Sequence, residues 1–293
     1  MLPIMFTRNT LPAVVLAALL IGSVAACATS DDSPPNSGNT SAAAAACAPG
    51  SLPTKTAGKL TIGTDKPAYP PWFDNNDPSD GKGFESAVAY QVAQRLGYAR
   101  ESVMWTSVTF NNAIAPGPKN FDFDINEFSI TPERRNAVDF SAPYYSVRQV
   151  VITTKGSKAA GAKSIADLRT AKIGAQVGTT SYQEITDVLK PSAKPQVFNN
   201  NDDLKAALAN GTVDAGVVDL PTGFFMTAAE IKDGVIVGQL PQVGAPEQFG
   251  LVLDKGSALT ACVSQAVDQL SQDGTLTVLE KTWLSDAGAP ELK

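Results

Sequence analysis

Two apolar, β-branched runs constrain the fold of this chain most, because each follows a series of alternating strand and helix patterns. The runs are 147–154 (VRQVVITT) and 249–253 (FGLVL). Before the first run the pattern predicts strands at 59–64, 103–108 and 122–125, and a helix at 83–96. Between the runs it predicts strands at 172–177, 196–198 and 215–218, and helices at 164–168, 181–189 and 201–209. Helices at 257–270 and 274–284 follow the second run. This alternation predicts an α/β protein with mostly parallel sheets.

The two runs divide the chain into two predicted lobes that are joined by two crossing strands. Lobe one is predicted to span 51–150 plus 254–293, and lobe two to span 151–253. The chain has 293 residues, which is enough for two domains of ordinary size. Its apolar fraction of 43% suits a globular protein with a hydrophobic core.

Charge and composition exclude several classes of function. The chain carries 23 Lys and Arg against 29 Asp and Glu, and the resulting net charge of -6 disfavours nucleic acid, which needs a basic face. It contains no His, so Ser-His-Asp, Cys-His and His-metal chemistry are unavailable. We therefore expect no metal site, no cofactor and no nucleic-acid partner, and we separately expect a monomer.

The N-terminus has the features of a secretion signal. Residues 1–26 combine the positive charge of Arg8 with an apolar run at 11–21 that is too short for an ordinary transmembrane helix. The sequence Val-Ala-Ala-Cys that ends at Cys27 resembles a lipobox, in which Cys27 takes the lipid; the alternative is a plain signal peptide cleaved nearby. Residues 27–50 are rich in Ser, Ala, Asn and Pro, and predict a flexible, lipid-anchored tether. We expect the protein at the extracytoplasmic face of the cell membrane.

Two further cysteines lie at the two ends of the folded part. Cys47 ends the tether and Cys262 lies in a predicted helix near the C-terminus. Two remaining cysteines in an exported chain predict a disulfide between them. The alternative is two unpaired thiols, one buried and one exposed.

The segment 129–145 reads SITPERRNAVDFSAPYY and is the most informative stretch for function. Thr131 before Pro-Glu is a plausible N-cap, with Pro at the first helical position and an acid in the first turn. Arg134 then lies one turn into the helix, beside N–H groups left free at its start. A planar cation beside free N–H donors forms a receptor for a carboxylate. The alternative is a capped surface helix whose Arg is solvated.

This segment resembles the signature of the polar amino-acid-binding subfamily (family 3) of bacterial extracellular solute-binding proteins, the receptors of ABC importers. The resemblance covers residues 57–285. It implies a two-lobe fold of the type II periplasmic-binding-protein kind that closes on its ligand like a hinge. It also implies that Ser129, Thr131 and Arg134 hold the α-carboxylate of the ligand.

Lobe two supplies two further candidate groups. The sequence Gly-Thr-Thr-Ser at 178–181 follows a predicted strand and opens a predicted helix, where free N–H groups bind anions. The motif alone is weak, and the resemblance places the ligand carboxylate near Thr179 and Thr180. Asp219 ends a predicted strand at its carboxyl end, where open α/β sheets bind ligands. The resemblance matches Asp219 to the ammonium-binding Asp of the family; the alternative is a helix N-cap.

The resemblance implies four more pocket residues. Tyr69 and Phe110 match the positions that sandwich the ligand, and Gln176 matches a polar position in lobe two. Asp65, after the first strand, matches a frequent pocket acid; the alternative is an Asp that forms a turn before Lys-Pro.

Glu127 departs from the family pattern, which usually has Gly two residues before the first hydroxyl of this turn. A carboxylate here could select a cationic side chain, meet the ammonium of the ligand, or point to solvent. The choice bears on the identity of the ligand.

Three functions compete. The resemblance implies a lipid-anchored receptor that delivers a polar or charged amino acid, or a related amine-carboxylate, to an ABC permease without doing chemistry. A periplasmic-type dehydratase of aromatic amino-acid precursors would need a general acid, and with no His that hypothesis depends largely on Glu127. A ligand sensor would need a separate membrane partner.

Overall fold

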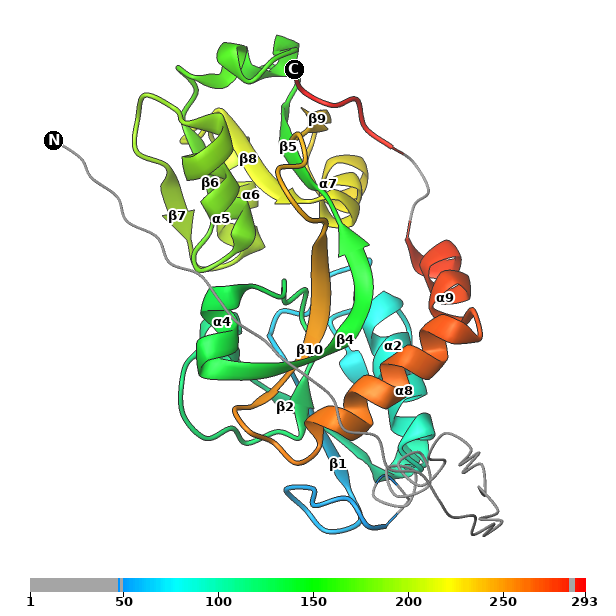
Figure 1. The fold of residues 1–293 in the computed structure, drawn as a ribbon. Helices are drawn as coiled ribbons and strands as arrows, with labels where there is room; N and C mark the ends of the chain where they lie inside the picture. Colours follow the sequence, from blue (N-terminus) through cyan, green and yellow to red (C-terminus); the bar gives the residue numbers. More distant parts are fainter. Residues whose placement is uncertain (1–46, 48–49, 285–287) are drawn as a thin grey trace, which may run out of the picture.

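The computed structural model describes residues 47, 50–284 and 288–293, which form two five-stranded sheets (Figure 1). The strands of the first sheet are β1 (Leu60–Thr64), β2 (Val103–Ser107), β3 (Phe123–Asp124), β4 (Val138–Val147) and β10 (Glu247–Asp254). Those of the second sheet are β5 (Gln149–Thr154), β6 (Ile173–Gln176), β7 (Gln196–Phe198), β8 (Ala215–Asp219) and β9 (Gly234–Gln239). Each sheet with its helices forms one lobe.

The two sheets have the same strand arrangement. The order is β2-β1-β3-β10-β4 in lobe one and β7-β6-β8-β5-β9 in lobe two. In lobe one, β10 pairs antiparallel with both of its neighbours, and the other pairs are parallel. In lobe two, β5 has this antiparallel role. Four strands of each sheet therefore run one way and one runs against them, which confirms the predicted α/β fold of two lobes with mostly parallel sheets.

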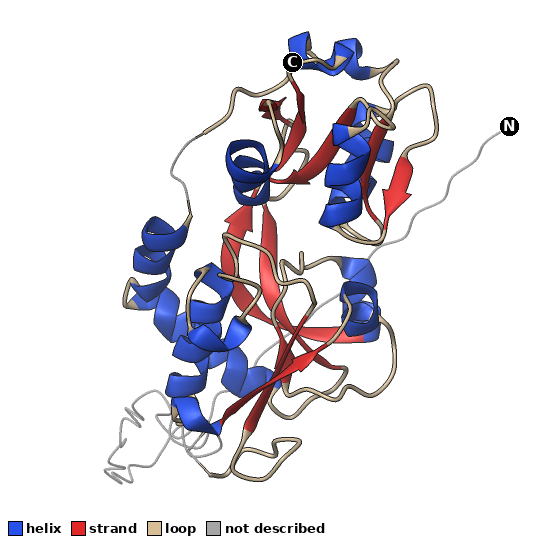
Figure 2. Ribbon diagram, turned by 180° about the vertical axis from the view of Figure 1, so that it is seen from behind, coloured by secondary structure: helices blue, strands red, loops and turns tan. Residues whose placement is uncertain are grey.

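The crossing strands are the two apolar runs. Only Arg148 separates β4 of lobe one from β5 of lobe two, and residues 240–246 lead from β9 back to β10. Figure 2 shows from behind how these long strands connect the two lobes. In each sheet, the strand that runs against the others is the first one after a crossing, so the chain enters each lobe in the same way.

The sheet pairings distribute two segments differently from the predicted lobe ranges. All of β10 pairs with β3 or β4, so the run 249–253 lies in the sheet of lobe one. The C-terminal residues 288–293 pack on lobe two instead (Figure 1). There the Leu292 N–H donates to the Gln239 carbonyl over 2.9 Å, and Leu292 is buried in the core of lobe two. The predicted signal peptide and nearly all of the predicted tether lie outside the described residues.

The helices cover the sheets of their own lobes. In lobe one these are α2 (Phe84–Arg95), α3 (Phe110–Ile114), α4 (Pro132–Ala137), α8 (Thr260–Gln272) and α9 (Thr275–Trp283). In lobe two they are α5 (Thr180–Glu184), α6 (Asn201–Ala209) and α7 (Leu220–Phe225). Both α5 and α7 continue as π-helical turns, at 185–189 and 226–230. No helix in the described part of the chain is both long and apolar enough to cross a membrane.

The sequence pattern did not predict β4, β9, α3 or α7. The β4 segment contains Pro143, which usually argues against a strand interior, and its pairing with β10 shifts register at that point. The β9 segment contains two glycines, which weaken a strand pattern. Gly238 is nevertheless required, because a Cβ there would lie 2.8 Å from the Pro290 carbonyl oxygen of the C-terminal segment.

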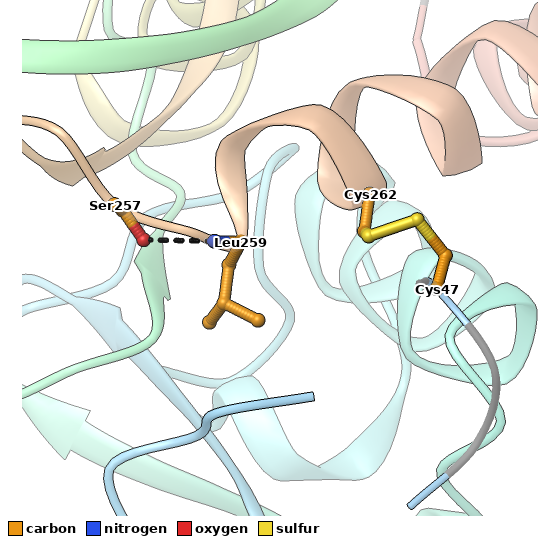
Figure 3. Close-up of a disulfide and its surroundings, with 4 residues drawn as sticks. All are labelled: Cys47, Ser257, Leu259 and Cys262. Atoms are coloured by element: carbon orange, nitrogen blue, oxygen red, sulfur yellow. Dashed lines mark hydrogen bonds between the residues drawn. A yellow bond between two sulfur atoms is a disulfide. The ribbon is translucent and has the colours of Figure 1, made fainter. Parts of the chain in front are cut away.

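The predicted disulfide is present between Cys47 and Cys262, whose Cα atoms lie 5.4 Å apart (Figure 3). Cys262 lies in the first turn of α8, and the loop before that helix is held by the Ser257 hydroxyl, which accepts a hydrogen bond from the Leu259 N–H over 3.2 Å. The bridge therefore fastens the beginning of the described chain to the helix layer of lobe one.

Candidate functional site

A pocket lies between the two lobes, at the carboxyl ends of strands from both sheets. Asp65 follows β1, Gln176 ends β6 and Asp219 ends β8. This is the edge at which parallel α/β sheets present ligand-binding groups. The lining residues are Asp65, Pro67, Tyr69, Phe110, Asn126, Glu127, Gln176, Thr179, Thr180, Ser181, Asn200, Asn201, Val217, Val218, Asp219 and Thr222. Eight of the predicted site residues are among them, and Ser129, Thr131 and Arg134 lie immediately beside it.

Arg134 is buried and joins the two lobes. Its helix begins as predicted, because the Thr131 Oγ1 accepts a hydrogen bond from the Arg134 N–H over 3.2 Å. The guanidinium donates from Nη1 to the Ser129 carbonyl over 2.7 Å and from Nη2 to the Gly178 carbonyl of lobe two over 2.9 Å. Only 9% of Arg134 is exposed, so the alternative of a solvated surface Arg is wrong.

The guanidinium of Arg134 remains a cation at neutral pH. Burial lowers its pKa to about 10, and the negative charges of Glu247 and Asp219 oppose that shift. The ring of Phe110 supports it from one side, with 5.3 Å between the guanidinium carbon and the ring centre. Phe110 in turn stacks on Phe128, with 4.9 Å between the ring centres.

Two hydroxyl groups face each other across the lobes beside Arg134. The Oγ of Ser129 lies 3.1 Å from the Oγ1 of Thr180, which is the first residue of α5. Thr179 is the N-cap of the same helix, and its Oγ1 accepts from the Tyr182 N–H over 3.2 Å. Gly178 before it has a φ of +78°, and a Cβ there would lie 2.3 Å from the Asn111 Oδ1, so only glycine fits.

At the other end of the pocket two acids meet. Glu127 lines the pocket, and its Oε2 accepts a hydrogen bond from the Thr222 hydroxyl of lobe two over 2.8 Å, so it does not point to solvent. Glu127 and Asp219 also lie close enough for their charges to interact. Burial, and then the repulsion between nearby carboxylates, raises the pKa of each well above its ordinary value.

Glu127 has a backbone conformation that suits the glycine usual at this position. Its φ is +51°, in the left-handed region that side chains rarely adopt. The buried carboxyl of Glu85 holds this turn, because its Oε1 accepts from the Glu127 N–H over 2.7 Å and from the Tyr144 hydroxyl. Burial raises the pKa of Glu85 to about 7, although both hydrogen bonds act against the shift. Glu85 therefore lies in the first turn of α2 and also holds the turn that contains Glu127.

The remaining predicted residues line the side of the pocket formed by lobe one and the end of β6. The carboxylate of Asp65 accepts from the Phe110 N–H over 3.0 Å and from the Lys66 N–H over 2.7 Å, so it shapes its turn as well as lining the pocket. Tyr69 and Gln176 also line the pocket. Burial raises the pKa of the Tyr69 hydroxyl.

Sequence reasoning missed three residues that link the predicted ones. Glu247 accepts a hydrogen bond from the Ser129 hydroxyl over 2.6 Å, and Gln149 donates to Asp219 over 2.5 Å. Thr222 accepts a hydrogen bond from the indole N–H of Trp72 over 2.7 Å, and its own hydroxyl donates a hydrogen bond to Glu127. Their positions in the sequence were the available signal. Gln149 is a buried polar residue inside the first crossing run, and Glu247 lies two residues before the second run.

The chain resembles proteins of known kind in sequence and in structure. Residues 60–286 match the bacterial extracellular solute-binding proteins, family 3. An arginine-binding extracellular protein of Bacillus subtilis (strain 168) is 27% identical over 233 residues, which cover 78% of this chain and 86% of that protein. The glutamine-binding protein of an ABC transporter from the same organism is 30% identical over 220 residues, which cover 73% of this chain and 77% of that protein.

A solved structure shares the fold along nearly its whole length. It is the crystal structure of an ancestral amino acid-binding protein, a precursor of cyclohexadienyl dehydratase, and it has a TM-score of 0.64 and 29% identity. The match covers 78% of this chain and 96% of that one. Since the family match spans most of the folded chain and the site lies between two lobes of the expected kind, this protein belongs to the bacterial extracellular solute-binding proteins, family 3.

Proposed function

We propose that this protein is the substrate-binding receptor of an ABC importer, and that it binds a polar or charged amino acid, or a related amine-carboxylate, between its lobes. The observation that carries the proposal is the charge order of the pocket. We assign Arg134, with the hydroxyls of Ser129 and Thr180, to the carboxylate end of the site, and Glu127 with Asp219 to its ammonium end. A carboxylate and an ammonium on one small molecule complement these two ends.

The excess of acid favours a ligand with an additional positive charge. Besides Glu127 and Asp219, the carboxylates of Asp65 and Glu247 lie in or beside the pocket, against the cation of Arg134. An amino acid with a cationic side chain would neutralise this excess, and the Bacillus relative is described as arginine-binding. We therefore infer that Glu127 and Asp219 share the ammonium and the cationic side chain of the ligand.

A thermal-shift screen of the amino acids and related amines tests the proposal, because a ligand that binds only the folded state raises the melting temperature by mass action. We expect arginine-like and lysine-like ligands to give the largest shifts, and acidic amino acids to give none. Calorimetry then measures the affinity of each hit. Absence of any shift across the amino acids would refute the proposal.

The partner and the location follow from the family. Its members are extracellular, so the protein acts outside the cytoplasm. We infer that the two lobes close on the ligand, that the protein is a monomer, and that it presents the ligand to a membrane permease. We also infer that Cys27 carries a lipid that holds the receptor at the membrane. Labelling cells with an alkyne-bearing fatty acid tests this, because Cys27→Ala should abolish the incorporation.

An enzymatic function is the second candidate, because one relative of known structure is a precursor of cyclohexadienyl dehydratase. A pocket carboxyl whose pKa is raised by burial, as that of Glu127 is, could act as a general acid. We propose binding without chemistry, since the described residues offer the charge pattern of a receptor. Turnover of prephenate or arogenate by the purified protein would reverse this ranking.

A further inference from the structure

Gln149 and Glu247 open the two crossing strands and lie between the two ends of the proposed ligand site. Gln149 is the first residue of β5, and Glu247 is the first residue of β10. Gln149 is 4% exposed, and a polar side chain buried this deeply costs free energy unless its hydrogen bonds are made. The proposed function gives Gln149 no role and counts Glu247 only as one of the acids beside the pocket.

All polar atoms of the Gln149 side chain are engaged. Its Nε2 donates to the Asp219 Oδ1 over 2.5 Å and to the Glu247 Oε2 over 3.0 Å. Its Oε1 accepts from the hydroxyl of Ser181 in α5 over 2.7 Å. An amide has two N–H donors, so each of them serves one carboxylate.

The sheets fix one half of this arrangement to each lobe. The pairing of β5 with β8 places Gln149 directly opposite Asp219, so these side chains share a face of the sheet in lobe two. Glu247 pairs with Val147 in lobe one, and its Oε1 accepts from the hydroxyl of Ser129 over 2.6 Å. The hydrogen bond from Gln149 to Glu247 therefore joins a pair held by lobe two to a pair held by lobe one.

We propose that Gln149 and Glu247 are positioning residues that couple the two ends of the ligand site. Gln149 holds the Asp219 carboxylate toward the ammonium, Glu247 holds the Ser129 hydroxyl beside Thr180, and the bond between them sets one end relative to the other. This proposal rests on the proposed function, since it assigns the two ends to one ligand.

The electrostatic surroundings make a neutral donor necessary at Gln149. Asp219 and Glu247 face its amide directly, and Glu127 lies against Asp219 on the pocket side. Glu184 of α5 lies near Glu247. Two cations are also close: Arg134 interacts with Glu247 and Asp219, and Arg148 lines a small pocket together with Gln149, Glu184 and Glu247. A carboxylate in place of the amide would add a negative charge among acids and would remove both donors.

The test is the substitution Gln149→Glu, followed by calorimetry of the best ligand across pH. The variant keeps the size of the side chain and an acceptor for Ser181. We expect its affinity to fall about 10- to 100-fold relative to the wild type at about pH 8, because two buried hydrogen bonds are lost and a like charge is added among acids. The deficit should shrink as the pH falls toward about 5, because the introduced carboxyl gains a proton and can donate again.

The matched control is Gln248→Glu, which adds the same charge one residue from Glu247 on the opposite face of β10. It should bind within about threefold of the wild type, with no recovery at low pH. A second measurement is the cycle of Gln149→Leu and Glu247→Ala. Coupled positioning predicts that the double variant loses no more affinity than the worse single variant, whereas independent roles predict that the losses multiply.

The outcomes separate this proposal from the one on which it rests. If the wild type binds no amino acid in the same titrations, the proposed function fails. If the wild type binds and Gln149→Glu behaves like Gln248→Glu at all pH values, the receptor function stands and the positioning role is overturned. A lowered affinity that does not respond to pH, together with multiplicative losses in the cycle, would also overturn it.

Discussion

The two lobes share one strand order but differ in what they bury. The core of lobe one contains large aromatic rings, among them Trp72, Phe84 and Phe249, whereas the buried cores of lobe two are built from aliphatic side chains. Within the described residues, the buried charged side chains Glu85, Asp122, Asp124 and Arg134 all lie in lobe one. The shared strand order therefore does not determine which side chains form the interior of each lobe.

The difference indicates a division of labour in the site. In lobe one, the buried Glu85 fixes the turn of Glu127, and the buried Arg134 supplies the cation. Lobe two contributes hydroxyl and carbonyl groups, together with Asp219 at the end of a strand. A buried charge costs free energy unless it is paired, so such groups persist where a binding surface needs them. Substitutions that change one lobe and leave the other unchanged can test this division.

The largest effect is expected from the disulfide, which belongs to lobe one alone. Cys47→Ser opens a bridge that spans 215 residues of sequence, and loss of a native disulfide costs about 2–5 kcal/mol of unfolding free energy. Thermal unfolding measures the loss, and hydrogen exchange should report lower protection in α8 while β5 and β8 keep theirs. Cys262→Ser should give the same loss, with no further effect in the double variant. Equal loss of protection in both lobes would contradict independent interiors.

The next largest effect is expected at the cation of lobe one. Arg134→Ala should weaken ligand binding by at least about 100-fold, because a charge-assisted contact to the carboxylate is lost and two carbonyls are left without their donor. Calorimetry measures it. Arg135→Ala is the matched control, since this neighbour is exposed and should change affinity by less than about threefold. An unchanged affinity in Arg134→Ala would refute the carboxylate role.

A pair of buried acids in lobe one offers a pH test. Both oxygens of Asp124 lack a partner among the described residues, whereas Asp122 accepts from the Thr61 N–H over 2.6 Å and the Lys55 N–H over 2.7 Å. Burial raises the pKa of Asp124 well above its ordinary value, so the folded state retains a proton that the unfolded chain releases. The stability that this proton allows is full at low pH and is lost as pH rises above about 4.

Asp124→Asn should therefore raise the unfolding free energy by about 1–3 kcal/mol near about pH 8 and leave it nearly unchanged near about pH 4. Asp122→Asn is the contrasting variant and should destabilise the protein by about 1–3 kcal/mol at neutral pH, because it replaces an acceptor of two backbone N–H groups. Chemical denaturation at the two pH values distinguishes them. A destabilised Asp124→Asn near pH 8 would show that its carboxylate is ionised and held by partners.

Much of the fold and part of the site could be predicted from the sequence, because these features depend on residues that are close together in the chain. The crossing runs, the capped helix at Thr131 and the strand end at Asp219 depend on neighbouring residues, and the structure has all three. The contacts of Gln149 with Glu247 join residues 98 positions apart, and no periodicity encodes them. β9 was missed for the same reason, because its Gly238 is required by the distant C-terminal segment, which packs against it. Glu127 is a different case. The sequence shows that it replaces the usual glycine, but the direction of its side chain depends on a contact with Thr222 of the other lobe.

The smallest effect is expected at the C-terminal segment. This segment belongs to neither lobe alone, because it follows α9 of lobe one but packs on lobe two. Glu291 forms an ion pair with Arg148, the residue between β4 and β5, over 2.7 Å, and its side chain is 57% exposed. Glu291→Gln should lower the unfolding free energy by about 0.2–1 kcal/mol, and the difference should vanish in high salt. Leu292→Ala is the matched comparison, since Leu292 is 3% exposed in the core of lobe two and should cost about 2 kcal/mol or more regardless of salt. If the two variants cost the same at low salt, the ion pair holds the segment as firmly as its burial does. If Leu292→Ala costs less than Glu291→Gln, the segment is not part of the core of lobe two, and the two interiors are separate along the whole chain.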